Sequence, residues 1–361
     1  MSHFDASLAH FPKITYSRYR KLTAYFSDLK NLWEAELPEM VAAGLEENIA
    51  NEFIAWREAN PTEKITERMA QEGITTVSLG EPNYPKLLAE ITDPPHTLFI
   101  RGKLPDSSLP TLAVVGARKF TQYGASSCRQ IVEPLARQGM VIVSGLAIGI
   151  DGIAHEAALA GQGITVAVLG SGVDHNHIYP ATNRELAERI ISSGGAVISE
   201  YPPGFEATNY SFPARNRIIA GLALGTLVIE AAEESGTLIT ASCALDYNRE
   251  VFAIPHTIIS SVGIGCNNLI KQGAKMVTVP NDITEALNLK NIQQVVENRQ
   301  KISASPIEEK IIDILSREPK HVDLIIKETG LNGPSVMSAL TLMEMRVMVR
   351  NLGGMKYILV G

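Results

Sequence analysis

The chain has 361 residues, of which 45% are hydrophobic and 20% are charged, so it can bury a large core in two or three globular domains. Its formal net charge of -7 argues against a protein coated in basic residues, and any contact with nucleic acid would need a local cluster of cations. The three cysteines, at unpaired spacing, fit neither a disulfide framework nor a four-thiolate zinc site.

Targeting and membrane signals are missing from the sequence pattern. No apolar run is long enough to span a bilayer, and none near the N-terminus precedes a small-residue cleavage site. We therefore expect a cytoplasmic protein with reduced thiols and no membrane span.

Residues 1–70 are predicted to form a helical domain. Their apolar residues recur at helix-face spacing and show no strand alternation; examples are Leu22, Tyr25, Phe26, Leu29 and Leu32. The segment 72–102 combines prolines with short β-rich pieces. We interpret it as a connector at the start of a second domain, residues 71–290.

Within residues 71–290, short apolar runs alternate with helical patterns. A run that is apolar at every position suits a strand covered on both faces, so these runs predict a parallel, doubly wound α/β sheet with crossover helices. In such sheets ligands bind beyond the carboxyl ends of the strands. The runs are 112–115, 141–143, 165–169, 196–198, 227–229 and 251–254.

The C-terminal part reads as a linker followed by a small domain. Residues 291–306 are polar and end in a Ser/Pro-rich stretch. Residues 307–361 then give three helical patterns and a β hairpin turned by Gly353 and Gly354, an order that predicts a winged-helix module. Its recognition helix would run from Ser335 to Arg346, and this helix is poor in basic residues.

Basic residues follow the first strand of the predicted sheet. The loop 116–124 opens a helix at the position where dinucleotide-binding folds hold a pyrophosphate, but it lacks the GxGxxG spacing. Arg118 and Lys119 occupy this loop, so it is suited to meeting a phosphate with side-chain charge. The alternative is a solvated turn.

A second Gly-rich loop, residues 144–151, follows the next strand. Gly145 would let a ligand approach the backbone closely. Asp151 and His155 lie four residues apart on the ensuing helix, and we interpret them as a capping carboxylate and a packed imidazole rather than a catalytic pair.

The segment 174–177, Asp-His-Asn-His, suggests a metal site because two imidazoles and a carboxylate fall within four residues. No further ligands occur at metal spacing, so a polar loop tip is the preferred interpretation. We predict neither a metal nor a cofactor.

The stretch 211–221 is the centre of the predicted site. It places Phe212, Arg215, Asn216 and Arg217 just ahead of an apolar helix, where unpaired backbone N–H groups and the helix dipole favour anions. The two arginines could instead bridge to carboxylates, Glu200 or Glu230. Because alternate residues of an extended segment point in opposite directions, one arginine would bind an anion and the other would brace the fold.

The loop 235–237 offers a second anion seat. Ser235, Gly236 and Thr237 resemble a backbone nest, and no histidine pairs credibly with the serine as a nucleophile. Lys271 and Lys275 would extend the positive rim, with a solvated helix end as the alternative.

Aromatic residues interleave with these charges. Loops that alternate cations with planar side chains suit single-stranded nucleic acid, whose bases stack on rings while its phosphates follow Arg and Lys. Phe212 is the ring expected to be exposed. The set comprises Phe120, Tyr123, Tyr201, Phe205, Tyr210 and Phe212.

Four of these motifs, at 116–118, 144–151, 212–221 and 235–241, together resemble the DNA-processing protein A (DprA, or Smf) family over residues 70–290. The resemblance implies an extended Rossmann fold with an N-terminal helical domain of sterile-alpha or helix-hairpin-helix type and a C-terminal winged helix. It also implies a homodimer that binds single-stranded DNA and loads the RecA recombinase during natural transformation.

Two positions depart from the family pattern. Ile148 stands where the family usually has arginine, which removes one possible phosphate contact. The segment 11–15 replaces the glycines of a helix-hairpin-helix turn with Lys and Thr, so DNA binding by the N-terminal domain is not implied.

The resulting prediction is a non-enzymatic binder of single-stranded DNA, with Arg118, Lys119, Arg215 and Arg217 as cations. The main alternative is a Rossmann-fold nucleotide N-glycosidase, which needs a catalytic carboxylate such as Glu200 or Glu230. A duplex-reading transcription factor is the third hypothesis, and the near-neutral recognition helix argues against it.

Overall fold

The computed structural model describes residues 3–289, 306–315, 319–345 and 349–359. The chain divides into two compact units, residues 1–290 and 291–361. All of the predicted linker, 291–306, except Pro306 lies outside the described residues, and its boundaries stay a prediction.

The first unit begins with six helices, of which the first five share a core that includes Leu22, Met40 and Phe53. Side-chain caps begin two of them: Thr15 accepts a hydrogen bond from the backbone N–H of Arg18, and Asp28 from that of Asn31. The helices are α1 (His3–Ala9), α2 (Tyr16–Tyr25), α3 (Leu29–Glu34), α4 (Leu37–Ala42), α5 (Glu47–Ala59) and α6 (Thr62–Gln71).

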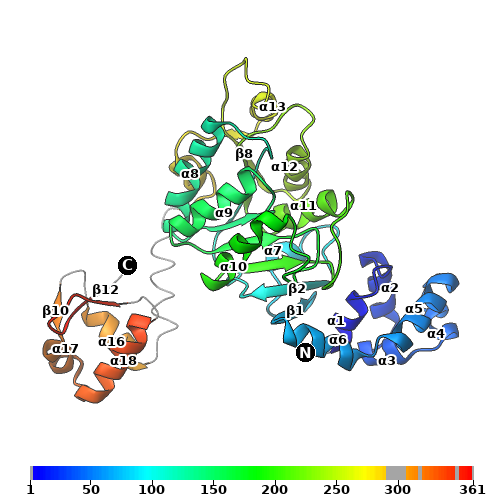
Figure 1. Ribbon diagram of the computed structural model, residues 1–361, viewed down its shortest axis with the longest axis horizontal. Helices are drawn as coiled ribbons and strands as arrows, with labels where there is room; N and C mark the ends of the chain where they lie inside the picture. The colour runs from blue at the N-terminus through cyan, green and yellow to red at the C-terminus, as the bar shows by residue number, and fades with distance from the viewer. Residues whose placement is uncertain (1–2, 290–305, 316–318, 346–348, 360–361) are drawn as a thin grey trace. The chain divides into compact units, whose positions relative to one another are not determined.

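A nine-stranded sheet follows, in the order β1-β2-β6-β5-β4-β3-β7-β8-β9 (Figure 1). The six predicted apolar runs form strands β3 to β8, and these pair in parallel, which confirms the predicted α/β class. The strands are β1 (Ile74–Ser78), β2 (Thr97–Gly102), β3 (Thr111–Val115), β4 (Val141–Ser144), β5 (Thr165–Val168), β6 (Ala196–Ser199), β7 (Gly225–Val228), β8 (Glu250–Ala253) and β9 (Lys275–Met276).

The interpretation of residues 72–102 as a connector was wrong. Strand β1 pairs antiparallel with β2, and β2 pairs antiparallel with β6, so the segment extends the sheet at its edge. Phe99 in β2 is fully buried and shares a hydrophobic cluster with Ala6 and Ala9 of α1 and Ile65 of α6. The N-terminal helices therefore pack directly on the sheet.

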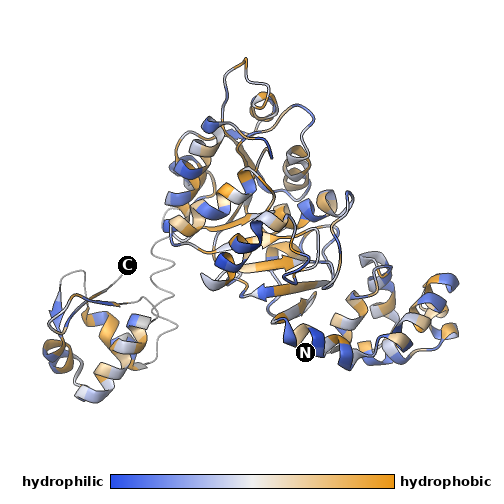
Figure 2. Ribbon diagram, in the orientation of Figure 1, coloured by the Kyte–Doolittle hydropathy of each residue, from blue (hydrophilic) through white to orange (hydrophobic). Residues whose placement is uncertain are grey.

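Helices cover both faces of the sheet. On one face, Val115, Val143 and Val168 pack with Ile218 and Ala241, which come from α11 (Ser211–Gly221) and α12 (Thr237–Asp246). On the other face lies a layer formed by α8 (Gln122–Arg137), α9 (Ile150–Ala160) and α10 (Arg184–Ser192). Figure 2 shows that the strands between the layers carry mainly hydrophobic residues, as expected for strands buried on both faces.

The order of the strands defines where loops gather. Strand β3 lies between β4 and β7, so the crossovers that leave β3 and β6 run in opposite directions along the sheet. Carboxyl ends of strands near such a switch point form the usual ligand crevice of doubly wound folds. After β8 the unit ends with α13 (Ile264–Lys271), β9 and α14 (Pro280–Ala286).

The second unit has winged-helix architecture, as predicted. Three helices among its described residues share a core that includes Ile325, Val336 and Leu340, and three described strands pair in the order β10-β12-β11. Gly353 and Gly354, with φ of 90° and 59°, turn the hairpin. The elements are α16 (Pro306–Ile314), β10 (Lys320–His321), α17 (Val322–Thr329), α18 (Gly333–Met345), β11 (Val349–Asn351) and β12 (Lys356–Leu359), and α18 matches the predicted recognition helix up to Met345.

Candidate nucleic-acid interface

Helix α11 carries the residues at the centre of the predicted site. They were expected just ahead of a helix, but α11 already begins at Ser211 and includes them all. Two contacts explain this early start: the N–H of Thr208 donates to the Ser211 hydroxyl at 2.9 Å, and the N–H of Ser211 donates to the Thr208 hydroxyl at 3.2 Å. Pro213 is tolerated because the first turn of a helix has no N–H partner to lose.

Arg215 points into the sheet. Its side chain is buried, and its Nη1 donates hydrogen bonds to the carbonyl of Gly145, at 2.6 Å, and to that of Val168. Its Nε has no hydrogen-bond partner among the described residues. Burial lowers the pKa of Arg215 to about 10, so the guanidinium stays protonated at neutral pH. A cation therefore lies at the carboxyl ends of β4 and β5.

Gly145 has a different role from the one expected. It was predicted to admit a ligand, but a Cβ at this position would overlap the guanidinium of Arg215, which already fills the space. The Gly145 N–H donates to the Asp151 carboxylate at 3.1 Å, so this residue links the arginine and the aspartate through its backbone. Burial raises the pKa of Asp151, and the charge of Arg215 opposes that rise.

The residue one turn after Asp151 is a packed histidine, as interpreted. His155 is fully buried and its Nδ1 lies 2.7 Å from the hydroxyl of Thr165.

A shallow pocket of about 40 Å³ opens beside Arg215. We call it the arginine pocket. The guanidinium carbon of Arg118 lies 5.5 Å from the centre of the Phe212 ring, which in turn lies 5.4 Å from the Tyr179 ring. The lining residues are Arg118, Gly145, Ala147, Ile148, Gly170, Tyr179, Pro180, Phe212 and Arg215. Three separate crossover loops and α11 therefore meet at one point, and no carboxylate lines it.

The rings of the pocket differ from expectation in their exposure. Phe212 was predicted to be exposed but is half-buried, because Arg118 and Tyr179 cover its ring. Tyr179 is 53% exposed and was not singled out from the sequence. Its position after the predicted strand at 165–169, in a carboxyl-end loop, was the available signal. Ile148 is 55% exposed on the pocket wall where an arginine was expected from the resemblance.

Arg118 and Lys119 are exposed in the loop after β3. Within the described ranges neither side chain makes an ion pair, so the two charges are available to a ligand. The same loop is anchored by Glu230, which is fully buried and accepts hydrogen bonds from the N–H of Thr121, at 3.0 Å, and from its hydroxyl. One of the two candidate catalytic carboxylates is thereby committed to holding the loop.

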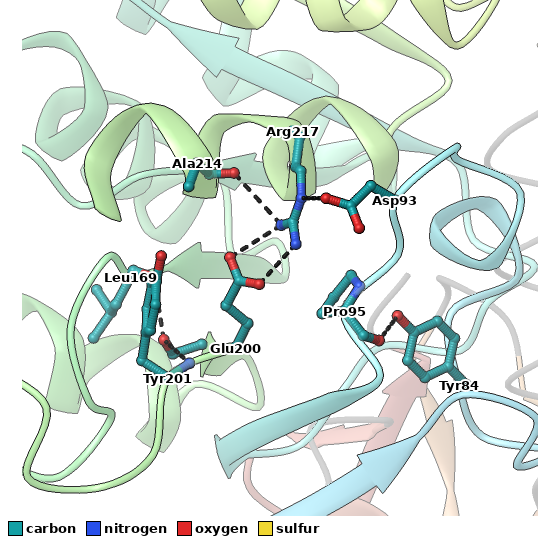
Figure 3. A network of polar contacts seen from close by, with 9 residues as sticks. Tyr84, Asp93, Pro95, Leu169, Glu200, Tyr201, Ala214 and Arg217 are labelled. Atoms are coloured by element: carbon teal, nitrogen blue, oxygen red, sulfur yellow. Dashed lines mark hydrogen bonds and ion pairs between the residues drawn. The ribbon is translucent and has the colours of Figure 1, made fainter. Parts of the chain in front are cut away.

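Arg217 lies in a separate ion-pair network (Figure 3). Its Nη1 and Nη2 donate to the two carboxylate oxygens of Glu200 at 3.0 and 2.7 Å, and its Nε lies 3.4 Å from Asp93. Burial raises the pKa of Glu200 even though Arg217 opposes the rise. The bidentate geometry braces α11 against the segment that follows β6, and the Asp93 contact ties it to the loop that precedes β2.

The two arginines therefore diverge, as the sequence suggested, but for a helical reason. Positions two apart on an α-helix are separated by about 200°, so Arg215 faces the strands and Arg217 the opposite side. The extended segment assumed for this argument does not exist.

The loop 235–237 begins α12 and contacts α11. Asn216 Nδ2 lies 3.4 Å from the carbonyl of Gly236. Two of the three N–H groups expected to bind an anion are already bonded: Ser235 N–H donates to the carbonyl of Ala232 at 3.2 Å, and Thr237 N–H donates to the Ser235 hydroxyl at 3.2 Å.

Two predicted rim cations lie further along the sheet. Lys271 ends α13, which packs on β8 and not on the strands of the arginine pocket. Lys275 pairs with Glu250 at 3.0 Å.

The segment 174–177 forms a polar loop tip. Asp174 accepts a hydrogen bond from the N–H of Gly204 at 2.8 Å and contacts Nδ1 of His177. In the part of the chain that the structure describes, no three His, Cys, Asp or Glu side chains gather as metal ligands would. The described helices also include none long and apolar enough to cross a membrane.

Comparisons with known proteins cover most of the chain. The sequence model of the DNA recombination-mediator protein A family matches residues 62–288, and that of the DprA winged helix domain matches residues 297–355. The chain is 42% identical to protein Smf of Escherichia coli over 73% of its own length and 71% of the relative's, and 33% identical to protein Smf of Synechocystis over 94% of both.

Solved structures give the same result. DNA processing protein A of Streptococcus pneumoniae superposes with a TM-score of 0.66 at 34% identity, over 79% of this chain and 98% of that one. A DNA processing protein A of Helicobacter pylori, whose structure concerns its single-stranded DNA binding mode, superposes with a TM-score of 0.53 at 29% identity, over 60% of this chain and 97% of that one.

Proposed function

Since the chain belongs to the DNA recombination-mediator protein A family, we propose that it binds single-stranded DNA at the arginine pocket and delivers that DNA to the RecA recombinase. One observation carries the proposal: the cation of Arg118, from the loop after β3, meets the cation of Arg215 and the ring of Phe212, both on α11, in one pocket whose described lining contains no carboxylate. Phosphates would meet the cations, and a base would stack on an aromatic ring.

The cationic residues divide by environment. Arg118 and Lys119 are exposed and reach solvent, so they meet phosphates directly. Arg215 contributes its charge from the buried side of the arginine pocket, because its Nη1 is occupied by backbone carbonyls. Arg217, held by Glu200 and Asp93, supports α11, and Lys271 contacts only DNA that continues beyond the pocket.

We propose a binding protein and not an enzyme. A nucleotide N-glycosidase would need a carboxylate facing the substrate, whereas Glu230 holds the loop after β3 and Glu200 holds Arg217. Neither lines the arginine pocket.

The biological setting follows from the family. We propose a cytoplasmic homodimer that protects incoming DNA during natural transformation. The three free cysteines suit a reducing compartment. Ile258 and Ile259, which are 94% and 90% exposed on the loop before α13, offer a second copy an apolar contact.

The test measures affinity for single- and double-stranded oligonucleotides of equal length while salt is varied. We expect a preference for the single strand, and a salt slope that falls by about 0.7 for each phosphate contact removed. Arg118→Ala combined with Lys119→Ala should reduce the slope by about 1.4. The matched control is Lys21→Ala combined with Lys30→Ala, which removes the same charge from exposed positions on α2 and α3.

A salt-independent affinity, or a slope unchanged in the Arg118 and Lys119 variant, would refute the proposed contacts. Incubation with nucleoside monophosphates serves as the enzyme assay, and release of free base would favour the glycosidase. RecA filament assembly on coated single strands tests delivery.

A further inference from the structure

A second cavity lies between the N-terminal helices and the sheet loops of the first unit. It has a volume of about 320 Å³, within the range of small-ligand sites. Its walls come from the end of α1, from α5 and α6, and from the loop after β6, and include His10, Trp56, Lys64, Arg68, Pro203 and Phe205. We call it the α6 cavity. None of its residues lines the arginine pocket.

The α6 cavity combines free cations with planar rings. Lys64 and Arg68 lie four residues apart on α6, so both side chains project from one face of the helix. Lys64 makes no ion pair within the described ranges. Arg68 pairs there only with Glu72, at 3.6 Å, with an exposed Arg68 and a partly exposed Glu72, an arrangement of little energetic value. Trp56 and Phe205 are half-buried and supply ring surface.

An acceptor completes the wall. The ring Nδ1 of His10 lies 2.7 Å from the carbonyl of Ala6. Because a carbonyl only accepts, Nδ1 carries the proton, and Nε2 of the neutral ring is an acceptor. Burial lowers the pKa of His10, so the ring is neutral at physiological pH. Cations, rings and a hydrogen-bond acceptor together match a nucleotide, which has a phosphate, a base plane and N–H donors on the base edge.

One short loop joins the α6 cavity to the arginine pocket. Gly170, after β5, lines the arginine pocket, and two residues later the N–H of Gly172 donates to the carbonyl of Phe205 at 2.9 Å. Gly172 also packs against the carbonyl of Pro202 and the N–H of Gly204, both in the cavity-lining loop. Two residues of chain span at most about 7 Å, so the two sites lie close together, on either side of this buried loop.

We propose that the α6 cavity is a second subsite for the same DNA strand, and that it takes one nucleotide with the phosphate on Lys64 and Arg68 and the base against Trp56. The inference rests on the proposed function of the arginine pocket. A strand long enough to pass the Gly170–Gly172 loop occupies both sites, and a short one occupies the arginine pocket alone.

The experiment compares oligothymidylates of about 4 and about 16 nucleotides on the full chain. Lys64→Ala combined with Arg68→Ala should weaken binding of the long strand about tenfold and lower its salt slope by about 1.4. Affinity for the short strand should not change. Lys21→Ala with Lys30→Ala, on α2 and α3 of the N-terminal helices and absent from the cavity lining, is the control and should leave both affinities unchanged.

A second readout does not depend on removing charge. The chain has two tryptophans, Trp33 and Trp56, so a Trp33→Phe background reports on Trp56 alone. The long strand should quench its fluorescence, and the short strand should not.

The outcomes separate the two proposals. If neither strand binds, the arginine-pocket proposal fails and this inference fails with it. If both strands bind and the Lys64 and Arg68 variant behaves as the control does, the second subsite is refuted while the first stands. Quenching of Trp56 by an oligoproline peptide, without any effect of the long strand, would assign the cavity to a peptide instead.

Discussion

Two regions around helix α11 hold an arginine each, and their surroundings differ in charge. In the arginine pocket, Nη1 of Arg215 is bonded to the carbonyls of Gly145 and Val168, which are neutral. In the network of Figure 3, Arg217 is bonded to Glu200 and Asp93, which are acids. Both side chains are largely buried, so burial alone does not distinguish them.

The two arginines differ in how much positive charge remains available to a ligand. Carbonyl dipoles orient a guanidinium without cancelling its charge, and the acid that acts on Arg215, Asp151, is bonded to the N–H of Gly145 and makes no ion pair with the guanidinium among the described residues. Two carboxylates around Arg217 leave no net positive charge. The pKa values agree: burial lowers that of Arg215 to about 10, whereas for Arg217 Glu200 and Asp93 outweigh burial and raise it. A binding cation and a bracing cation can therefore be distinguished by their acceptors.

Exchanging each arginine for methionine tests this distinction most severely. Arg215→Met should weaken single-stranded DNA binding about 10- to 100-fold, because it removes the buried positive charge beneath the pocket, and Arg217→Met should change it less than about threefold. Both variants should unfold at a lower urea concentration. The free energy of unfolding should fall by about 3–5 kcal/mol where the substitution leaves a buried charge without its partner.

Arg215→Lys serves as the milder variant, since it retains the charge if Arg215→Met fails to fold. Equal losses of affinity in the Arg215 and Arg217 variants would invalidate the distinction.

Adding a methyl group at Gly145 should have a smaller effect through the same arginine. Gly145→Ala places a Cβ where the Arg215 guanidinium lies, and the buried side chain has little room to move. We expect a stability loss of about 1–3 kcal/mol and an accompanying loss of DNA affinity, measured by urea unfolding and fluorescence anisotropy. Gly333→Ala in the second unit is the matched control, because its Cβ would make only an ordinary contact with Ile326, at 3.6 Å. A neutral result at Gly145 would mean that the guanidinium is not fixed.

The smallest expected effect concerns pH. Burial raises the pKa of Asp151, so the folded chain holds this proton more tightly than the unfolded chain. Its contribution to stability is thus full below the ordinary pKa of 3.8 and is lost as the pH rises through the raised folded value. Asp151→Asn should flatten this part of the curve of unfolding free energy against pH. Glu200→Gln, which changes the carboxylate beside Arg217, is the comparison variant. An unaltered curve of unfolding free energy against pH in Asp151→Asn would contradict the assignment of this pH dependence to Asp151.

Much of the sheet could be predicted from the sequence because buried parallel strands leave a local pattern. The runs at 112–115 and 165–169 are apolar at every position, and both became strands. The segments that form β1 and β2 carry no such pattern. Their place in the sheet depends on the pairing of β2 with β6, which is distant in sequence. For the same reason the segment 72–102 was taken for a connector.

The site was predictable in its residue types and less so in its geometry. Arg118 and Lys119 are exposed in a carboxyl-end loop, as their position after a strand suggested. The burial of Arg215 depends on Gly145 and Val168, which are 70 and 47 residues away in sequence. The stretch 211–217 was expected just ahead of the helix, whereas the reciprocal bonds of Thr208 and Ser211 begin the helix before it.

The packing of α1 against β2 bears on how the protein can be shortened. The match to the DNA recombination-mediator protein A family begins at residue 62, yet Phe99 of the sheet packs in one cluster with Ala6 and Ala9, and its ring meets that of His10 at 5.2 Å. Cutting the chain at the start of the family match would expose an aromatic side chain and its apolar neighbours at the edge of the sheet. Residues 3–10 thus cover this edge of the sheet, and a minimal soluble version of this protein has to retain them.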